Sequence, residues 1–364
     1  MIVKDVIKVL EYFAPTGYQE SYDNIGLLVG SPDASVSGIL VCLDITPKVV
    51  DESLSVGANL IVSHHPIIFT GLKRLNGKTS TEQTIIKAIE NGVALYAAHT
   101  NVDSVWNGLN HRLAQLFKLT DLEILAPASD QLVKLITFAP HDHAQAVRDA
   151  MFVAGAGNIG DYSNCSYNIE GYGTFKGEDE STPFVGKKGE THIEPETRIE
   201  VVVPKPLLPP VLKSMLTAHP YQEVAYDIIP ILNKNPRAGL GMVGNLSKPE
   251  PENDFLGRIK EILGTGCIKH SALTGKLVSR VALCGGSGGS LIDHAINHKA
   301  NVYVTSDLKY HNFIDASSRI LLADVGHFES EKIAVDIFYE LLTKKMPNFA
   351  VLKSKVNTNP INYI

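Results

Sequence analysis

The sequence predicts an α/β protein in which a discontinuous α/β domain with a mostly parallel sheet is interrupted by a ferredoxin-like α+β insertion. In the first and last thirds of the chain, short apolar segments alternate with amphipathic helical segments. That alternation is typical of a parallel sheet covered by helices. The middle third instead follows the order strand, helix, strand, strand, helix, strand, which is the ferredoxin-like order.

The first third contains three apolar segments that we expect to form neighbouring strands. They lie at 37–45, 58–66 and 93–101, and helical patterns separate them. Pro47 opens the first of these helical patterns and Gly57 follows its end, which is the usual placement of both residues around a helix.

The last third repeats this alternation. Strands are expected at 278–286, 300–307 and 319–327, with a helix at 290–299 between the first two. The segment 330–346 has the apolar spacing of a long amphipathic helix that closes the domain.

Composition argues against several classes of protein. A net charge of −6 disfavours nucleic acid as a partner, because such binding rests on neutralising phosphates. The four cysteines are far apart, which fits reduced thiols in the cytoplasm better than a disulfide framework. Charged residues interrupt the N-terminal segment 1–13, so we expect an amphipathic helix there rather than a signal peptide. No apolar run is long enough to span a membrane.

His64 and His65 stand at the end of an expected strand, followed by Pro66. Open α/β sheets place their sites beyond the carboxyl ends of their strands, so this pair is a candidate for metal binding. Taken alone, an adjacent pair of histidines is more often an ordinary feature of a loop.

Two further expected strands also end close to side chains that could bind a metal ion. Asp103 follows the strand at 93–101, and its carboxylate could chelate or bridge hard divalent ions. His99 could orient a ligand, contact substrate, or be a hydrogen-bonded core residue. His327 and Glu331 are four positions apart, which places them on one face of a helix.

Together, three histidines and two carboxylates suit two divalent ions, with zinc favoured and iron, manganese or nickel as alternatives. Glu331 could bridge the ions at a spacing of about 3.5–4 Å, as in two-metal hydrolysis. Because the candidate ligands flank the middle third, we expect one domain formed by 1–128 and 236–364, with 129–235 inserted. Three consecutive domains are the alternative.

A glycine-rich turn and a polar segment are candidates for binding substrate. Backbone N–H groups at Gly285, Gly286 and Gly288 could contact phosphate, although a tight strand-to-helix turn explains the glycines equally well. Lys309 could contact phosphate, and His311 could act as an acid or a base.

Several stretches occur in an order that resembles a known family, the Nif-three-like dinuclear metal-centre proteins, also called GTP cyclohydrolase 1 type 2 homologues. The matching stretches are YDNIGLLVG, GANLIVSHHPIIF, AAHTNVD, GLGMVGNL, LCGGSGGSLI, VTSDLKYH and DVGHFESE. Tyr22 departs from the family's usual Trp, and Ser306 departs from its usual Gly.

The resemblance implies that His64, His65, Asp103, His327 and Glu331 are the metal ligands. It also implies a homohexamer built as a trimer of dimers and an inserted domain similar to PII or CutA proteins. The activity expected from it is metal-dependent hydrolysis, with ring opening of the nucleotide GTP or phosphoester cleavage as candidates. The alternative is a non-enzymatic metal-binding scaffold or regulator whose inserted domain senses a small molecule.

Overall fold

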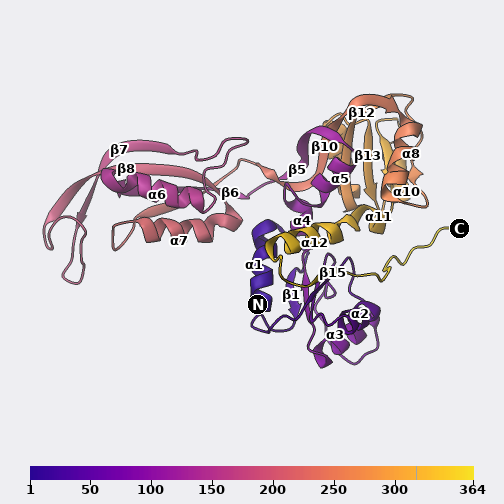
Figure 1. Ribbon diagram of the computed structural model, residues 1–364. Helices are drawn as coiled ribbons and strands as arrows, with labels where there is room; N and C mark the ends of the chain where they lie inside the picture. The colour runs from indigo at the N-terminus through magenta and orange to yellow at the C-terminus, as the bar shows by residue number, and fades with distance from the viewer. Residues whose placement is uncertain (317) are drawn as a thin grey trace. The chain divides into compact units, whose positions relative to one another are not determined.

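The computed structural model describes residues 1–316 and 318–364, and the chain divides into two compact units (Figure 1). One unit combines Met1–Pro127 with Ala238–Ile364, and the other consists of Ala128–Arg237. Both units mix helices with strands, so the α/β class is confirmed. The discontinuous unit holds two sheets. The strands expected in the first third of the chain lie in one sheet, and those expected in the last third lie in the other.

The first sheet of the discontinuous unit has the strand order β1-β4-β3-β2-β15. Its strands are β1 (Gly26–Val29), β2 (Ile39–Cys42), β3 (Leu60–Ser63), β4 (Ala94–Ala97) and β15 (Val351–Lys353). Four of them run parallel, and β1 is antiparallel to β4. Because β2, β3 and β4 are parallel and adjacent, their carboxyl ends meet at one edge of the sheet.

Helices cover both faces of this sheet, which explains why its central strands are almost entirely apolar. They are α1 (Val3–Phe13), α2 (Pro47–Ser55), α3 (Ser80–Glu90) and α12 (Ile333–Lys345). Within β2, Val41 packs in the same cluster as Phe338 of α12, whereas Leu40 packs with Val50 of α2. Thr46 begins α2 by accepting a hydrogen bond from the N–H of Val49.

The second sheet has the order β11-β14-β13-β12-β10-β5. Its strands are β5 (Leu119–Ala128), β10 (Asn235–Pro251), β11 (Lys269–His270), β12 (Leu277–Ser287), β13 (Val302–Ser306) and β14 (Leu321–Asp324). The three central strands β12, β13 and β14 are parallel. Their carboxyl ends therefore form a second edge at which polar side chains can gather.

The remaining α-helices of the discontinuous unit join its strands, and most of them pack against this second sheet. They are α4 (Thr100–Ser104), α5 (Leu109–Leu116), α8 (Glu252–Leu263), α9 (Ile292–Asn297), α10 (Tyr310–Asp315) and α11 (His327–Glu331). The helix expected at 330–346 is divided in the structure into α11 and α12, with Lys332 between them. The division lets the first helix carry site residues while the second packs against the core.

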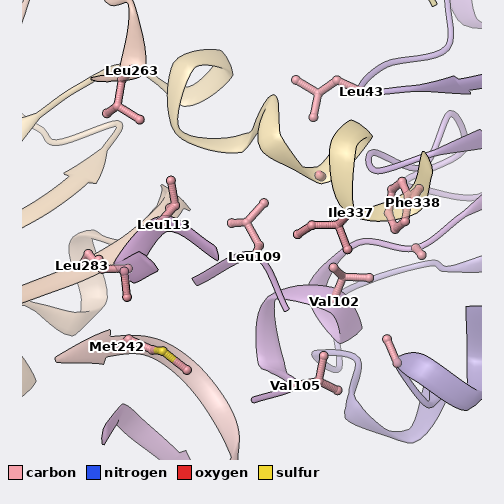
Figure 2. Packing of buried hydrophobic residues seen from close by; sticks show 14 of the residues in the cluster. Leu43, Val102, Val105, Leu109, Leu113, Met242, Leu263, Leu283, Ile337 and Phe338 are labelled. Carbon is pink, nitrogen blue, oxygen red and sulfur yellow. The ribbon is translucent and has the colours of Figure 1, made fainter. Parts of the chain in front are cut away.

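One apolar cluster connects the two sheets of the discontinuous unit. Figure 2 shows Leu109 of α5 lying between Leu113 and Ile337, with Phe338 nearby. Leu109 and Phe338 are fully buried, and burial of such a side chain contributes about 1.5–3 kcal/mol to stability. The shared core therefore holds the carboxyl edges of both sheets in a fixed relation.

The unit formed by residues 128–237 is an antiparallel sheet with two helices on one face. It comprises β6 (Leu132–Pro140), α6 (His141–Val153), β7 (Tyr167–Lys176), β8 (Thr191–Pro204), α7 (Leu208–Ala218) and β9 (Tyr226–Ile231). The strands lie in the order β7-β8-β6-β9. The predicted β-α-β-β-α-β order is observed, and the likeness to PII or CutA proteins stays a prediction.

Within residues 1–316 and 318–364, no helix combines the length and the apolar character that crossing a bilayer requires. All four cysteines are free thiols.

Candidate metal centre

His64 and His65 directly follow β3 at the carboxyl edge of the first sheet. Their backbone N–H groups donate to the carbonyl oxygens of Cys42 and Leu43, which continues the pairing with the neighbouring chain segment. The Ser63 hydroxyl donates to the carbonyl oxygen of His65 at 2.8 Å. These bonds hold the backbone of both histidines in place.

His99 and Asp103 follow β4 at the same edge. The short helix α4 begins immediately after His99, and the N–H of Asp103 donates to the His99 carbonyl oxygen. The side-chain amide of Asn110 donates to the carbonyl oxygen of Asp103 at 3.0 Å. Asp103 is only 8% exposed, so its carboxylate is held inside the protein.

His327 and Glu331 follow β14 of the second sheet and occupy the two ends of α11. Gly326 precedes this helix at a positive φ of 92°, a conformation that favours glycine. The four-residue spacing places both side chains on one helix face, as expected from the sequence. Glu331 is 2% exposed.

The structure brings all five residues of the predicted ligand set together. Oε2 of Glu331 lies 2.8 Å from Nε2 of both His65 and His327, and these two nitrogens are 3.4 Å apart. Oε1 of Glu331 lies 3.9 Å from Nε2 of His64, which is 3.7 Å from Oδ1 of Asp103. The five side chains thus form two groups of three that share Glu331.

A partner on the far side of each ring fixes the first two histidines. Nδ1–H of His64 donates to the carbonyl oxygen of Ala98 at 3.0 Å. Nδ1 of His65 lies 2.7 Å from Oδ1 of Asp44. Partners of this kind set the tautomer and the orientation of the ring, so the Nε2 atoms face the other candidate ligands.

The other two histidines are held in the same way. Nδ1 of His327 lies 2.7 Å from Oδ2 of Asp307, and Nδ1 of His99 lies 2.9 Å from Oδ1 of Asp23. His99 also forms a group of possible ligand atoms with His64 and His65. Its position allows either a supporting role or direct contact with a bound ion or substrate.

The pKa values of the histidines diverge because their surroundings differ. Burial lowers the pKa of His64 to about 4, so its imidazole is neutral. Burial also disfavours the charged form of His65 and His327, but hydrogen bonds with carboxylates outweigh it. Asp44 and Glu331 raise the pKa of His65 to about 10, and Glu331 and Asp307 raise that of His327 to about 9.

The pKa values of the two carboxylates, Asp103 and Glu331, shift in opposite directions. Burial and the nearby charge of Glu331 raise the pKa of Asp103 well above its usual range. Burial acts the same way on Glu331, but its contacts with His327, His64 and His65 hold the pKa well below the usual range. In the absence of an ion, the protonated imidazoles of His65 and His327 therefore balance the Glu331 charge.

Two buried atoms of this cluster show that the residues fit a metal ion. Among the described residues, neither Nε2 of His64 nor Oδ1 of Asp103 has a hydrogen-bond partner. Leaving such atoms unsatisfied costs about 1–3 kcal/mol each. A cation between them would satisfy both, and imidazole nitrogen with carboxylate oxygen is a usual donor set for divalent transition ions.

The glycine-rich turn lies against the carboxylate of Glu331. A Cβ atom on Gly286, which has a φ of 62°, would lie 2.0 Å from Oε1 of Glu331. The N–H of Gly286 donates to Oγ of Ser330 at 3.0 Å, and that of Gly285 donates to Oδ1 of Asn110 at 2.9 Å. These two N–H groups are therefore occupied within the chain.

The remaining candidates for substrate contact are Gly288, Lys309 and His311. A Cβ on Gly288 would lie 2.2 Å from Oγ1 of Thr305, so that glycine permits close packing of the turn. Lys309 and His311 are exposed at the start of α10. In the described part of the chain, neither forms a hydrogen bond or ion pair with the five converging residues.

Sequence reasoning missed the carboxylates that orient the histidines. Asp44 follows β2, which is parallel to β3, so the strand-end rule could have found it. Asp307 directly follows β13, so the same rule applies to it. For Asp23, no pattern in the sequence connects it with His99, 76 positions away.

Comparison with known proteins gives full-length matches. A GTP cyclohydrolase 1 type 2 homolog from Bacillus subtilis (strain 168) is 35% identical over 371 residues, covering 99% of this chain and 98% of the relative. A protein of the same name from Mycobacterium tuberculosis (strain ATCC 25618 / H37Rv) is 38% identical over 334 residues, covering 90% and 87% respectively.

Solved structures match over the same length. A Bacillus cereus protein related to NIF3 superposes with a TM-score of 0.86 at 36% identity, covering 100% of this chain and 99% of the other. A Staphylococcus aureus protein, SA1388, gives a TM-score of 0.77 at 28% identity with the same coverage. The family model described as Duf34/NIF3 (NGG1p interacting factor 3) matches residues 1–360. The resemblance drawn from the sequence is confirmed, and the chain belongs to the Duf34/NIF3 family.

Proposed function

We propose that this chain is a metal-dependent hydrolase with two divalent ions per chain. His64, Asp103 and Oε1 of Glu331 would hold one ion, and His65, His327 and Oε2 of Glu331 would hold the other. The observation that carries this proposal is the placement of the two Glu331 oxygens, each directed to a different group of donors.

Zinc is the ion that we propose first. Imidazole nitrogens and carboxylate oxygens, with three protein donors in each group, resemble catalytic zinc sites that leave a position for water or substrate. The same donor set also suits iron, manganese or nickel, because selectivity among these ions depends on geometry and availability as well as ligand type.

A pair of bound ions would supply a water of lowered pKa and polarise the electrophilic atom of the substrate. The residues of the chain would position these groups. Asp44, Asp307 and Asp23 hold Nδ1 of His65, His327 and His99. With Nδ1 held by a carboxylate, His99 could exchange a proton with substrate at Nε2.

GTP is the substrate that we propose to test first. The relatives named above are called GTP cyclohydrolase 1 type 2 homologs, and ring opening would require water to add to the imidazole carbon of guanine. Lys309 is our candidate for contact with the triphosphate, since it is exposed. Gly285 and Gly286 are not, because their N–H groups donate to Asn110 and Ser330. Phosphoester cleavage suits the same ligand set.

The experiment is to load the protein with zinc or manganese and incubate it with GTP and with a panel of phosphoesters. We expect turnover of one of these substrates that is lost on chelation and in Glu331→Gln. No turnover with any of them by protein shown to contain both ions would contradict a hydrolase of this specificity. That result would favour the alternative, a metal-binding scaffold or regulator.

We also propose that the chain assembles as a homohexamer, a trimer of dimers. The family resemblance supports this proposal. Sedimentation velocity on the metal-loaded protein should give the mass of six chains, and a monomer at micromolar concentration would contradict it.

A further inference from the structure

A cavity of about 750 Å³ lies in the unit formed by residues 128–237, against β7 and β8. That volume is within the range of small-molecule sites in proteins. On β8, Ile199 and Val201 pack into the core beneath the helices. Since side chains alternate along a strand, Glu196 and Arg198 point to the opposite face of the sheet, where they line the cavity.

Two glycines of β7 make room on this face. Gly171 is the register partner of Glu196, and Gly173 is the partner of Glu194. A Cβ on Gly171 would meet open space, whereas one on Gly173 would lie 2.3 Å from Oε2 of Glu196. The Glu196 carboxylate therefore lies over the bare backbone of β7, at the floor of the cavity.

Glu196 is a buried carboxylate without a cationic partner in the described residues. It is 8% exposed, and Oε1 accepts a hydrogen bond from the Tyr221 hydroxyl at 2.7 Å. The nearby guanidinium of Arg198 pairs instead with Glu200, at 2.8 Å. A buried charge is costly unless a partner of opposite charge compensates it.

His219 does not supply that charge. Its Nε2–H donates to the carbonyl oxygen of Phe138 at 2.9 Å, and its Nδ1 accepts from the N–H of Tyr221 at 3.2 Å. One donated and one accepted bond define a neutral imidazole. Burial lowers the pKa of His219, which agrees with the neutral form.

Three aromatic rings line the cavity with Glu196. The ring centroid of Tyr221 lies 6.2 Å from that of Phe175 and 6.3 Å from that of Phe184. Aromatic faces attract cations, and cages of such rings bind ammonium groups. The charge of the lining also favours a cation, because acidic side chains outnumber basic ones. The acidic residues are Glu170, Glu178, Glu196 and Glu223, and the basic residues are Lys176 and Arg198.

We propose that this cavity binds a small organic cation, with an ammonium or amidinium group at Glu196 and an apolar body among Phe175, Phe184 and Tyr221. The site lies in a different unit from the metal centre and uses none of its residues. Its test is therefore independent of the proposed hydrolase function.

The test is isothermal titration of the full chain with three probes of similar shape, in EDTA so that the metal centre cannot bind an amine. Tryptamine is the cation, tryptophol the neutral analogue, and indole-3-propionate the anion. We expect tryptamine to bind at least roughly tenfold more tightly than tryptophol, and the anion to bind most weakly.

Matched variants assign the preference to the carboxylate. Glu196→Gln should remove the advantage of tryptamine over tryptophol, whereas Glu223→Gln, the same change at an exposed lining position, should retain it. Phe184→Leu, at a half-exposed position, should weaken the binding of tryptamine at least roughly threefold. No binding of tryptamine at millimolar concentration, or equal binding of all three probes, would overturn the proposal.

Discussion

Oε2 of Glu331 lies 2.8 Å from Nε2 of His65, although 266 positions separate the two residues. His65 follows a strand of the first sheet, and Glu331 lies on the helix that follows a strand of the second. The centre therefore forms only when both carboxyl edges are in place. A bound ion would stabilise the folded chain, because the unfolded chain cannot gather these donors.

Glu331→Gln should reduce the metal content from about two ions per chain to less than one, because the amide can no longer offer an anionic oxygen to both groups. The measurement is elemental analysis after dialysis against metal-free buffer. Glu329→Gln is the matched control on the same helix, since the Glu329 carboxylate accepts a bond from Asn359 at 3.1 Å. Retention of both ions by Glu331→Gln would contradict its shared role.

Asp307→Asn should weaken binding at one of the two sites. The carboxylate holds Nδ1 of His327 at 2.7 Å, and loss of such a partner typically lowers metal affinity roughly 10- to 100-fold. Competition with a chromophoric chelator would measure both affinities. Asp315→Asn, on the exposed side of α10, should leave them unchanged. Equal affinities in the two variants would show that Asp307 does not support the site.

Gly286→Ala should impair metal binding without unfolding the chain. The added methyl group would lie 2.0 Å from Oε1 of Glu331, and the φ of 62° is unfavourable for alanine. We expect the carboxylate to move and affinity to fall roughly tenfold or more. Gly289→Ala is the control in the same turn, because its nearest neighbours would be 3.7 Å away. Unchanged affinity in Gly286→Ala would mean that Glu331 need not occupy this position.

Asp23→Asn should make the free energy of unfolding less dependent on pH below about pH 4. Burial opposes ionisation of Asp23, but bonds from His99 and Thr100 lower its pKa to about 2. Because the folded pKa is below the unfolded one, the carboxylate stabilises the fold above about pH 4. That contribution is lost as the pH falls through about 2.

Urea unfolding in EDTA would measure this effect. The wild-type chain should exceed Asp23→Asn by about 2 kcal/mol near pH 7, with the difference shrinking as the pH falls from about 4 towards 2. Asp33→Asn, at an exposed position, should show no such difference. A difference between wild type and Asp23→Asn that stays constant over this range would exclude the assignment.

Local patterns were sufficient to predict much of the fold. The apolar runs around Val41, Val62 and Leu95 predicted buried parallel strands, because only sheets covered on both faces contain such runs. The ends of those strands predicted where His64 and Asp103 would gather. The division of the strands into two sheets was not predicted, since the apolar patterns on the two sides of the insertion are alike.

The supporting contacts of the site could not be predicted, because they depend on pairings across the tertiary structure. Asp44 and Asp307 each lie just after a strand, which marks both as candidates, but no local pattern shows that they would hold His65 and His327. The cavity beside Glu196 is likewise formed by β7, β8 and the segment around Tyr221. Alternation along β8 suggests which residues share a face, but it does not show that the face is hollow.

The most direct test is a crystal structure with anomalous diffraction data collected at the absorption edge of the bound metal. We expect two peaks per chain about 3.5–4 Å apart, one beside His64 and Asp103 and the other beside His65 and His327, with Glu331 between them. A single peak, or peaks away from Glu331 in protein saturated with metal, would contradict the dinuclear centre.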